Sequence, residues 1–155
     1  MIVTIDVDDA GWEGIPALAE LAARAMNAAV AAAHVKHDTL ETAILFTSDD
    51  AMMALNAQWR GKAYATNVLS FAAEDFPVPA GEVQPLGDIV LGSGVVRREA
   101  AEQGKTLPDH ATHLIIHGLL HLLGYDHETG DEAIVMEELE IEILKGLGIS
   151  NPYDR

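Results

Sequence analysis

The chain has 155 residues, the length of one ordinary domain, and a domain of this size buries a sizeable core without staples. Hydrophobic residues make up 49% of it and charged residues 22%, which excludes a chain that stays unfolded. It contains no cysteine, so disulfides and thiolate metal sites are excluded and His, Asp and Glu remain as the strong metal ligands. The formal net charge of −16 counts against broad, non-specific binding of nucleic acid, because phosphates are held chiefly by Lys and Arg.

No segment has the pattern of an export signal or a membrane span. Residues 1–9 are acidic and strand-like, whereas a secretory signal has a basic start and then an apolar run. The longest apolar stretch, residues 15–33, is mostly alanine and is interrupted by Glu20 and Arg24. We therefore expect a cytoplasmic protein with no membrane partner.

The first third of the chain alternates predicted strands and helices. Residues 2–7 alternate apolar and polar side chains, as an edge or half-buried strand does. Pro16 then opens an alanine-rich helix that runs towards His34, and residues 42–47 form a second predicted strand.

A second helix follows directly. Ser48 is its predicted N-cap, and Met52, Leu55 and Trp59 lie at helical spacing and form its predicted buried stripe. Arg60 stands where this helix is expected to end.

Two more strands are predicted at residues 68–71 and 87–91. The segment between them is predicted to be a surface loop because it carries several residues that exclude regular structure, namely Pro77, Pro79, Gly81 and Pro85. Residues 92–94, Gly-Ser-Gly, lack the dinucleotide-binding pattern and are predicted to form a turn.

Helices fill the last third of the chain, over residues 95–103, 109–123 and 130–147. The glutamates of the final helix are expected to form a solvated face. We therefore predict an α+β fold in one domain over residues 1–155, with one small mixed sheet of about four strands packed with helices. A metal-binding helix of the zincin kind is expected near the C-terminus.

Three histidines have the spacing of a metal site. His117 and His121 are four residues apart, so both imidazoles project from one face of the predicted helix. Gly124 permits a left-handed turn that brings His127 back across that face as the third ligand. Three imidazoles leave a fourth position open, which is typical of a catalytic zinc site, so we expect zinc or another divalent transition metal here.

The alternative is that these histidines fill or cap a helix end, but unpaired ring nitrogens among Leu and Ile would carry a real desolvation cost. The spacing is also that of the metzincin peptidases, except that Gly118 stands where they have the glutamate base. Proteolysis is therefore disfavoured, although zinc alone lowers the pKa of bound water to about 7.

The remaining histidines and basic residues have simpler interpretations. We expect His113 to pack or to support a ligand rather than to bind metal, and His34, His37 and His110 to be solvated or capping. Arg97, Arg98 and Lys105 form the other basic cluster, which either extends an RNA groove or exposes charge on a helix face.

The segment HGLLHLLGYDH at residues 117–127 resembles the signature of the YbeY endoribonucleases. The resemblance continues along nearly the whole chain, in the same order and at similar spacing, at Leu55-Asn56, Arg60-Gly61-Lys62, Thr66-Asn67-Val68-Leu69-Ser70-Phe71, Gly87-Asp88-Ile89 and Met136-Glu137. Asn67 departs from the family, which usually has an aspartate there, and Ala65 stands where a proline is common.

The resemblance implies a metal-dependent endoribonuclease specific for single-stranded RNA. It further implies a role in maturing the 3′ end of small-subunit ribosomal RNA and in ribosome quality control. Ribosomal RNA is then the expected partner, and the acidic surface is compatible with basic ribosomal proteins as further partners.

By the same resemblance Arg60 is the catalytic arginine, acting with His117 and His121. A guanidinium can grip a phosphate and stabilise the charge that develops during cleavage, although an arginine at a helix C-terminus also suits the helix dipole. The residues we expect to contact substrate are Arg60, Lys62, Thr66 and Ser70.

Asp126 either orients a ligand histidine or stabilises the turn around Gly124. Two other functions share the predicted metal site. One is a metzincin-like metallopeptidase with an unusual base, and the other is a non-catalytic ribosome-assembly factor in which the metal is structural.

Overall fold

The protein is described by a computed structural model that covers residues 1–35, 39–74, 78–79 and 81–153. Four strands form one sheet in the order β1-β2-β4-β3, where β1 is Ile2–Val7, β2 is Leu40–Thr47, β3 is Val68–Ala72 and β4 is Gln84–Gly92. Strands β1, β2 and β4 run parallel, and β3 pairs antiparallel with β4. The predicted mixed sheet of about four strands, with its first strand at an edge, is confirmed.

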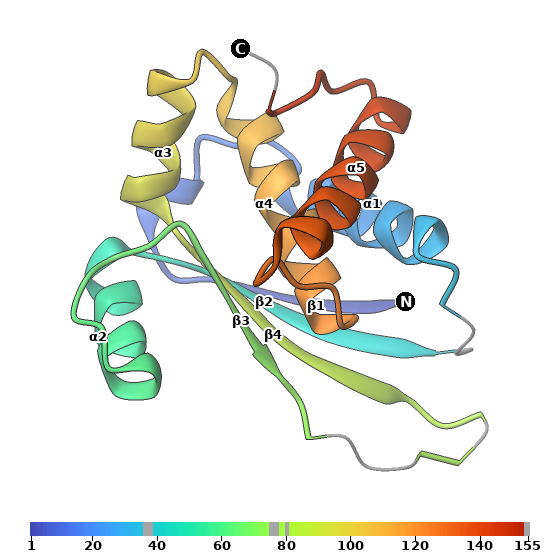
Figure 1. Ribbon diagram of the computed structural model, residues 1–155. Helices are drawn as coiled ribbons and strands as arrows, with labels where there is room; N and C mark the ends of the chain where they lie inside the picture. The colour runs from blue at the N-terminus through green and yellow to red at the C-terminus, as the bar shows by residue number, and fades with distance from the viewer. Residues whose placement is uncertain (36–38, 75–77, 80, 154–155) are drawn as a thin grey trace.

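Helices cover the two faces of this sheet unequally (Figure 1). The upper face in Figure 1 carries α1 (Leu18–Ala32), α4 (Leu107–Leu122) and α5 (Gly130–Gly146). Helix α3 (Ser93–Glu102) continues from β4 and packs against α4, and a short 3-10 turn at Ala10–Trp12 follows β1. Helix α2 (Asp49–Arg60) lies across the opposite face, so the α+β prediction is confirmed. No helix among the described residues is long and apolar enough to cross a membrane.

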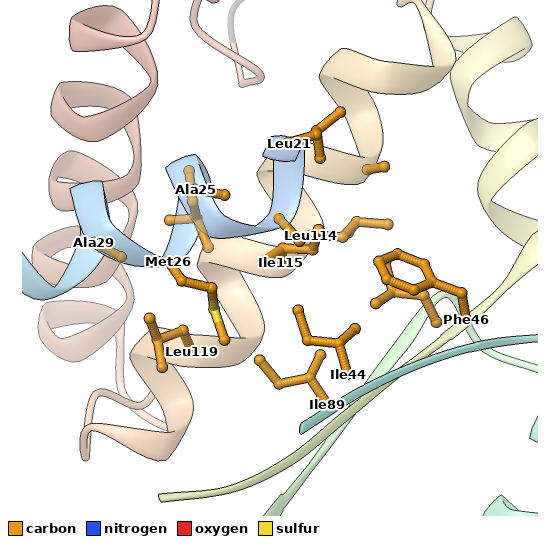
Figure 2. Packing of buried hydrophobic residues seen from close by; sticks show 14 of the residues in the cluster. Leu21, Ala25, Met26, Ala29, Ile44, Phe46, Ile89, Leu114, Ile115 and Leu119 are labelled. Carbon is orange, nitrogen blue, oxygen red and sulfur yellow. The ribbon is translucent and has the colours of Figure 1, made fainter. Parts of the chain in front are cut away.

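The core lies between the sheet and helices α1 and α4 (Figure 2). Alternate residues of the central strands, Ile44 and Phe46 of β2 and Ile89 of β4, point towards α4, as the two-residue period of a strand requires. Helix α1 faces α4 through alanines, including Ala25, which is fully buried. Small side chains let the two helices approach closely, and α4 is buried along most of its length.

The predicted buried stripe of α2 is wrong at Trp59. Met52 is fully buried against Leu69 and Val90, whereas Trp59 is 65% exposed. The covered patch is small, and α2 extends past it, so Trp59 borders an open cleft on this face of the sheet instead of joining the core.

Several element boundaries differ from the prediction. Helix α1 begins at Leu18 after a left-handed Ala17 (φ 52°), so Pro16 lies outside it, and it ends before the exposed His34. His37 and Pro77 lie outside the described residues. Pro85 belongs to β4 and not to the preceding loop, at a bulge where the register against β2 shifts, which is a position where a strand tolerates proline.

Residues 92–94 form no separate turn, because Gly92 ends β4 and Ser93 begins α3. The side chain of Asp49 fills the space beside Gly94, where an added Cβ would lie 2.3 Å from Asp49 Oδ2. Asp49 Oδ1 accepts a hydrogen bond of 3.0 Å from Val95 N, so this carboxylate supports the first turn of α3.

Two isoleucines test this core directly. Ile115 of α4 is fully buried, whereas Ile134 of α5 is 53% exposed. Replacing Ile115 with alanine leaves a cavity and is expected to lower the free energy of unfolding by about 2–5 kcal/mol. Ile134→Ala is the matched control and should change it by less than about 0.5 kcal/mol in urea denaturation. Equal effects of the two substitutions would contradict this packing.

Candidate metal centre

Helix α4 carries the first two histidines of the predicted triad. Thr106 caps the helix by accepting a hydrogen bond of 3.2 Å from Asp109 N. At the other end Gly124 adopts the predicted left-handed conformation (φ 103°), and Tyr125 N bonds back to Leu120 O at 3.0 Å. This turn returns the chain towards the helix, which places His127 beside His117 and His121.

The structure brings the three predicted ligands together. One ligand nitrogen from each of His117, His121 and His127 lies within 4.8 Å of the others, and the Nε2 atoms of His117 and His121 are 3.1 Å apart. Two imidazole nitrogens on one tetrahedral zinc, each about 2.0–2.1 Å from it, would lie roughly 3.3 Å apart. His117 and His121 are half-buried and His127 is exposed, so the triad is open to solvent on one side.

The outer ring nitrogens show why this triad suits a cation. His117 Nδ1 is hydrogen-bonded to Glu140 Oε1, and His121 Nδ1 to the Tyr125 carbonyl oxygen at 3.1 Å. Both partners only accept, so both Nδ1 atoms carry the proton. In the neutral rings the Nε2 lone pairs then face each other at 3.1 Å, an arrangement that a shared cation stabilises. The residues present therefore fit a metal ion.

The pKa of His121 is lowered, first by burial and then by the neighbouring rings of His117 and His127. A lowered pKa keeps the imidazole neutral, which is the form that binds metals. This electrostatic environment therefore agrees with the geometry of the triad.

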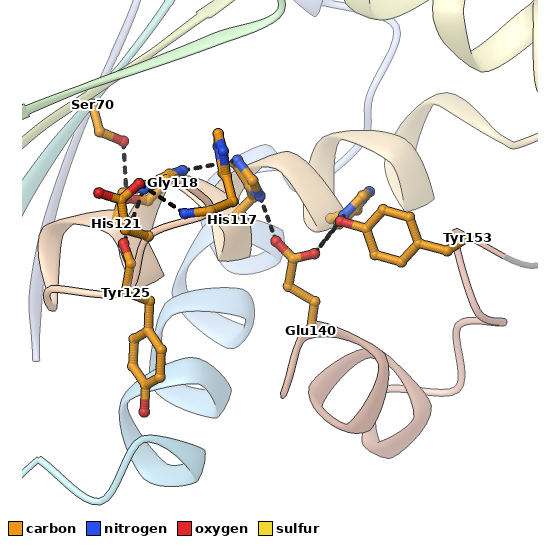
Figure 3. Close-up of polar contacts among 10 residues, drawn as sticks. Ser70, His117, Gly118, His121, Tyr125, Glu140 and Tyr153 are labelled. Carbon is orange, nitrogen blue, oxygen red and sulfur yellow. Dashed lines mark hydrogen bonds and ion pairs between the residues drawn. The ribbon is translucent and has the colours of Figure 1, made fainter. Parts of the chain in front are cut away.

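Glu140 of α5 is a site residue that the sequence prediction missed. The prediction placed the glutamates of this helix on a solvated face, but Glu140 is fully buried and contacts His117 (Figure 3). Burial alone would raise the pKa of this carboxyl group, and the hydrogen bonds from His113, His117 and Tyr153 outweigh it and lower the pKa to about 2. Glu140 is therefore an ionised carboxylate behind the metal centre.

The second carboxylate oxygen of Glu140 has two partners of its own. The Tyr153 hydroxyl donates to Oε2, and His113 Nε2 lies 3.4 Å from the same atom. His113 is thus next to the metal centre but outside the triad, as predicted. Burial lowers the pKa of its ring and, with Glu140, raises that of the Tyr153 hydroxyl.

A cleft of about 490 Å³ opens in front of the triad. The predicted substrate residues Arg60, Thr66 and Ser70 line it, whereas Lys62 is not among the described residues that do. Of those lining residues, Arg60 is the one arginine or lysine.

Arg60 is the last residue of α2, and the loop that follows is tied back to this helix. Gly61 ends α2 in the left-handed conformation (φ 68°), directly after Arg60. The buried Asn56 then donates a hydrogen bond of 2.9 Å to the Tyr64 carbonyl oxygen, which ties the loop to the helix. Arg60 and Tyr64 both line the cleft.

Asp126 lines the cleft but its described hydrogen bond is not to a ligand ring. Its Oδ1 accepts a hydrogen bond of 2.7 Å from His127 N, which corresponds to the predicted turn-stabilising role. The carboxylate that contacts a ligand ring is Glu140.

At Gly118, helix α4 lies close against the sheet. An added Cβ there would lie 3.1 Å from both Ile89 Cγ2 and Ser70 Oγ, and the Ser70 hydroxyl donates a hydrogen bond of 2.9 Å to the Gly118 carbonyl oxygen. Position 118 faces β3 and β4, so a larger side chain there would be packed tightly against Ser70 and Ile89.

A second polar cluster lies beside the cleft and corrects the prediction for His110. This histidine was expected to be solvated or capping, but it is 3% exposed and its Nε2 lies 3.0 Å from Glu99 Oε1. Asn67 Nδ2 donates to the same oxygen at 3.0 Å. Burial would raise the pKa of Glu99, but the hydrogen bonds from His110 and Asn67 outweigh burial and lower it.

The other basic cluster does not extend the cleft. Arg98 lies 3.4 Å from Asp49 Oδ2, Arg97 donates to the Gly11 carbonyl oxygen, and Lys105 Nζ donates to the Pro152 carbonyl oxygen at 3.3 Å. These residues are absent from the described lining of the metal cleft. They hold neighbouring segments of the chain together.

The close approach at Gly118 predicts a specific defect. Gly118→Glu should lower the free energy of unfolding by at least about 2 kcal/mol, because it overpacks the contact with β3 and β4 and places a charge there. Gly146→Glu is the control, since an added Cβ at Gly146 meets nothing within 4 Å. Thermal melting should separate the two variants by several degrees. A Gly118→Glu protein as stable as the wild type, or one with peptidase activity, would refute this account of position 118.

The cluster around Glu99 predicts a pH-dependent contribution to stability. A carboxyl group whose pKa is lowered by folding stabilises the fold above the unfolded value of 4.5, and this contribution is lost as the pH falls through the lowered pKa. Glu99→Gln should therefore melt at a lower temperature than the wild type at pH 7, and the gap should narrow below pH 4.5. The exposed Glu102 of the same helix supplies the control, Glu102→Gln. A gap that is constant with pH would show that the charge of Glu99 makes no such contribution.

Comparison with known proteins identifies the relatives of this chain. The sequence profile of the family described as Endoribonuclease YbeY matches residues 8–148. A Bartonella bacilliformis protein named Endoribonuclease YbeY is 46% identical over 153 residues, which cover 97% of this chain and 96% of that protein. A Rhizobium leguminosarum bv. trifolii protein of the same name is 46% identical over 160 residues, with 98% and 92% covered.

The fold is also similar to the solution structure of TM1509 from Thermotoga maritima. The TM-score is 0.59 at 22% sequence identity, over 99% of this chain and all of that one, so this likeness concerns the fold alone. The family, in contrast, is established by the profile over most of the chain and by relatives at 46% identity. The chain belongs to the YbeY endoribonuclease family.

Proposed function

We propose that this protein is a zinc-dependent endoribonuclease that cleaves single-stranded RNA in the cleft between α2 and α4. The observation that carries the proposal is that Arg60 and the histidine triad line one cleft. An endoribonuclease must bind an anionic phosphodiester and stabilise further charge as the bond breaks, and a guanidinium beside a metal-binding triad supplies both.

In this proposal Arg60 binds the non-bridging oxygens of the scissile phosphate and fixes its orientation towards His117, His121 and His127. Zinc held by the three imidazoles would supply Lewis acidity and a lowered pKa for a bound water. Thr66 and Ser70 also line the cleft and would contact the sugar-phosphate backbone. The Ser70 hydroxyl already donates to Gly118, so it would act towards RNA as an acceptor.

The cleft favours a single strand over a duplex. Its volume of about 490 Å³ suits a short stretch of one chain. Tyr64 lines this cleft and is 54% exposed, so an aromatic face is available to an unstacked base. The net charge of −16 repels RNA elsewhere on the surface, which confines binding to the neighbourhood of Arg60.

The proposed biological substrate is the 3′ end of small-subunit ribosomal RNA, with a further role in ribosome quality control in the cytoplasm. Support comes from membership of the YbeY endoribonuclease family. Basic ribosomal proteins suit the acidic surface as additional partners. The packing at Gly118 disfavours the metallopeptidase alternative. The exposed His127 and the cleft in front of the triad disfavour a metal with a purely structural role.

Substitutions of Arg60 and of His117 should have different effects on RNA cleavage and on zinc binding. Arg60→Glu should retain zinc and lose at least about 10²-fold in the rate of cleavage of a single-stranded oligoribonucleotide, because the group that stabilises the phosphate charge is gone. His117→Ala should lose zinc and activity together. Zinc content by atomic emission and cleavage by gel assay report the two properties, and the exposed Arg24 of α1 provides the control Arg24→Glu. An Arg60→Glu protein that cleaves RNA at the wild-type rate would refute the role of Arg60.

A further inference from the structure

Glu140 is a fully buried carboxylate, and burying one is costly unless hydrogen bonds satisfy it. It lies where α5 passes α4, and its neighbours come from two separate parts of the chain (Figure 3). His113 and His117 reach it from α4, and Tyr153 reaches it from the segment that follows α5.

Each described neighbour of this carboxylate can be assigned to one of its two oxygen atoms. Oε1 accepts from His117 Nδ1, and Oε2 accepts from the Tyr153 hydroxyl and lies 3.4 Å from His113 Nε2. Among the described residues the buried Nδ1 atom of His113 has no hydrogen-bond partner, whereas Nε2 lies near Glu140 Oε2, so we place the proton of the neutral ring on Nε2. The two oxygens therefore serve different purposes, one facing the triad and the other facing supporting donors.

We propose that Glu140 and Tyr153 are positioning residues of the metal centre. Glu140 holds His117 in the tautomer with Nδ1–H, which turns the bare Nε2 towards the metal, and Tyr153 fixes Glu140 in the orientation that does so. This inference rests on the proposed metal binding by the triad. It adds that the segment after the last helix contributes to the site through Tyr153, which is not one of the three predicted ligands.

The segment that carries Tyr153 is anchored at several points. Asn151 Oδ1 accepts a hydrogen bond of 2.8 Å from Tyr153 N, and Lys105 Nζ donates to the Pro152 carbonyl oxygen at 3.3 Å. The Tyr153 ring also packs edge-on against the His113 ring, with centroids 5.5 Å apart. These contacts of the neighbouring backbone and of the ring hold the Tyr153 hydroxyl beside Glu140.

Zinc affinity is the direct test, measured by competition with a chelator on the full chain. Glu140→Gln replaces the carboxylate by a neutral group of the same shape and should weaken zinc binding about 10–100-fold, the effect typical of losing an outer hydrogen-bond partner of a metal ligand. Tyr153→Phe should weaken it in the same direction by a smaller factor. Glu142→Gln alters an exposed glutamate of the same helix and should leave the affinity unchanged.

A second readout does not require metal. In the metal-free wild type, ¹⁵N-edited NMR should show His117 protonated on Nδ1, and Glu140→Gln should raise the proportion of the Nε2–H tautomer. Melting of the metal-free variants shows whether each one folds. If Glu140→Gln does not fold, Tyr153→Phe decides the question, because it removes one hydroxyl and keeps the ring.

The outcomes separate this inference from the proposed function. Wild-type affinity for zinc in both Glu140→Gln and Tyr153→Phe would overturn the positioning role while leaving the metal site intact. A His117 ring protonated on Nε2 in the metal-free wild type would also overturn it. A wild-type protein that binds no zinc would overturn the proposed metal site together with this inference.

Discussion

Helix α4 approaches the sheet so closely at Gly118 that a single added carbon would lie 3.1 Å from Ile89 and from Ser70. This contact sets the depth of the helix and therefore the place of the residues beside Gly118. His117 and His121 project from the side of α4 that borders the cleft, while position 118 is occupied by the packing against β3 and β4. The alanines of α1 allow the same closeness on another side of α4, so the helix that carries two histidines of the triad is held by its neighbours along its length.

The hydrogen-bond partners of the ring nitrogens then determine which nitrogens of the triad can bind a cation. The described hydrogen-bond partners of the Nδ1 atoms of His117 and His121 are acceptors, one a carboxylate and the other a backbone carbonyl. In the neutral rings the two Nε2 atoms therefore carry no proton, and they face each other. The fold thereby concentrates lone pairs at one point beside a cleft whose one arginine or lysine among the described lining residues is Arg60. In a chain with a formal net charge of −16, that placement makes the cleft a local site for an anion.

The parts of this structure that depend on local sequence were predictable. The strand alternation, the Ser48 cap, the turn at Gly124 and the triad all follow from short-range spacing, and the structure has each of them. The errors about which side chains are buried concern tertiary contacts. Glu140 resembles its exposed neighbours on α5 and becomes a buried partner of His117 only because α5 crosses α4, and His110 is buried only because α3 brings Glu99 against it. Trp59 is an error in the opposite direction. Its spacing along α2 predicts a buried side chain, but it lines an open cleft on this face of the sheet and is exposed.

The central claim is that three imidazoles hold one metal ion and leave a position open to the cleft. X-ray absorption spectroscopy of the zinc-loaded protein tests it most directly, because the fine structure reports the number and kind of ligands in the first shell. The account predicts three imidazole nitrogens and one oxygen from solvent, all at about 2.0 Å. A zinc shell with fewer than three imidazoles, or one closed by a fourth ligand from the protein, would contradict it.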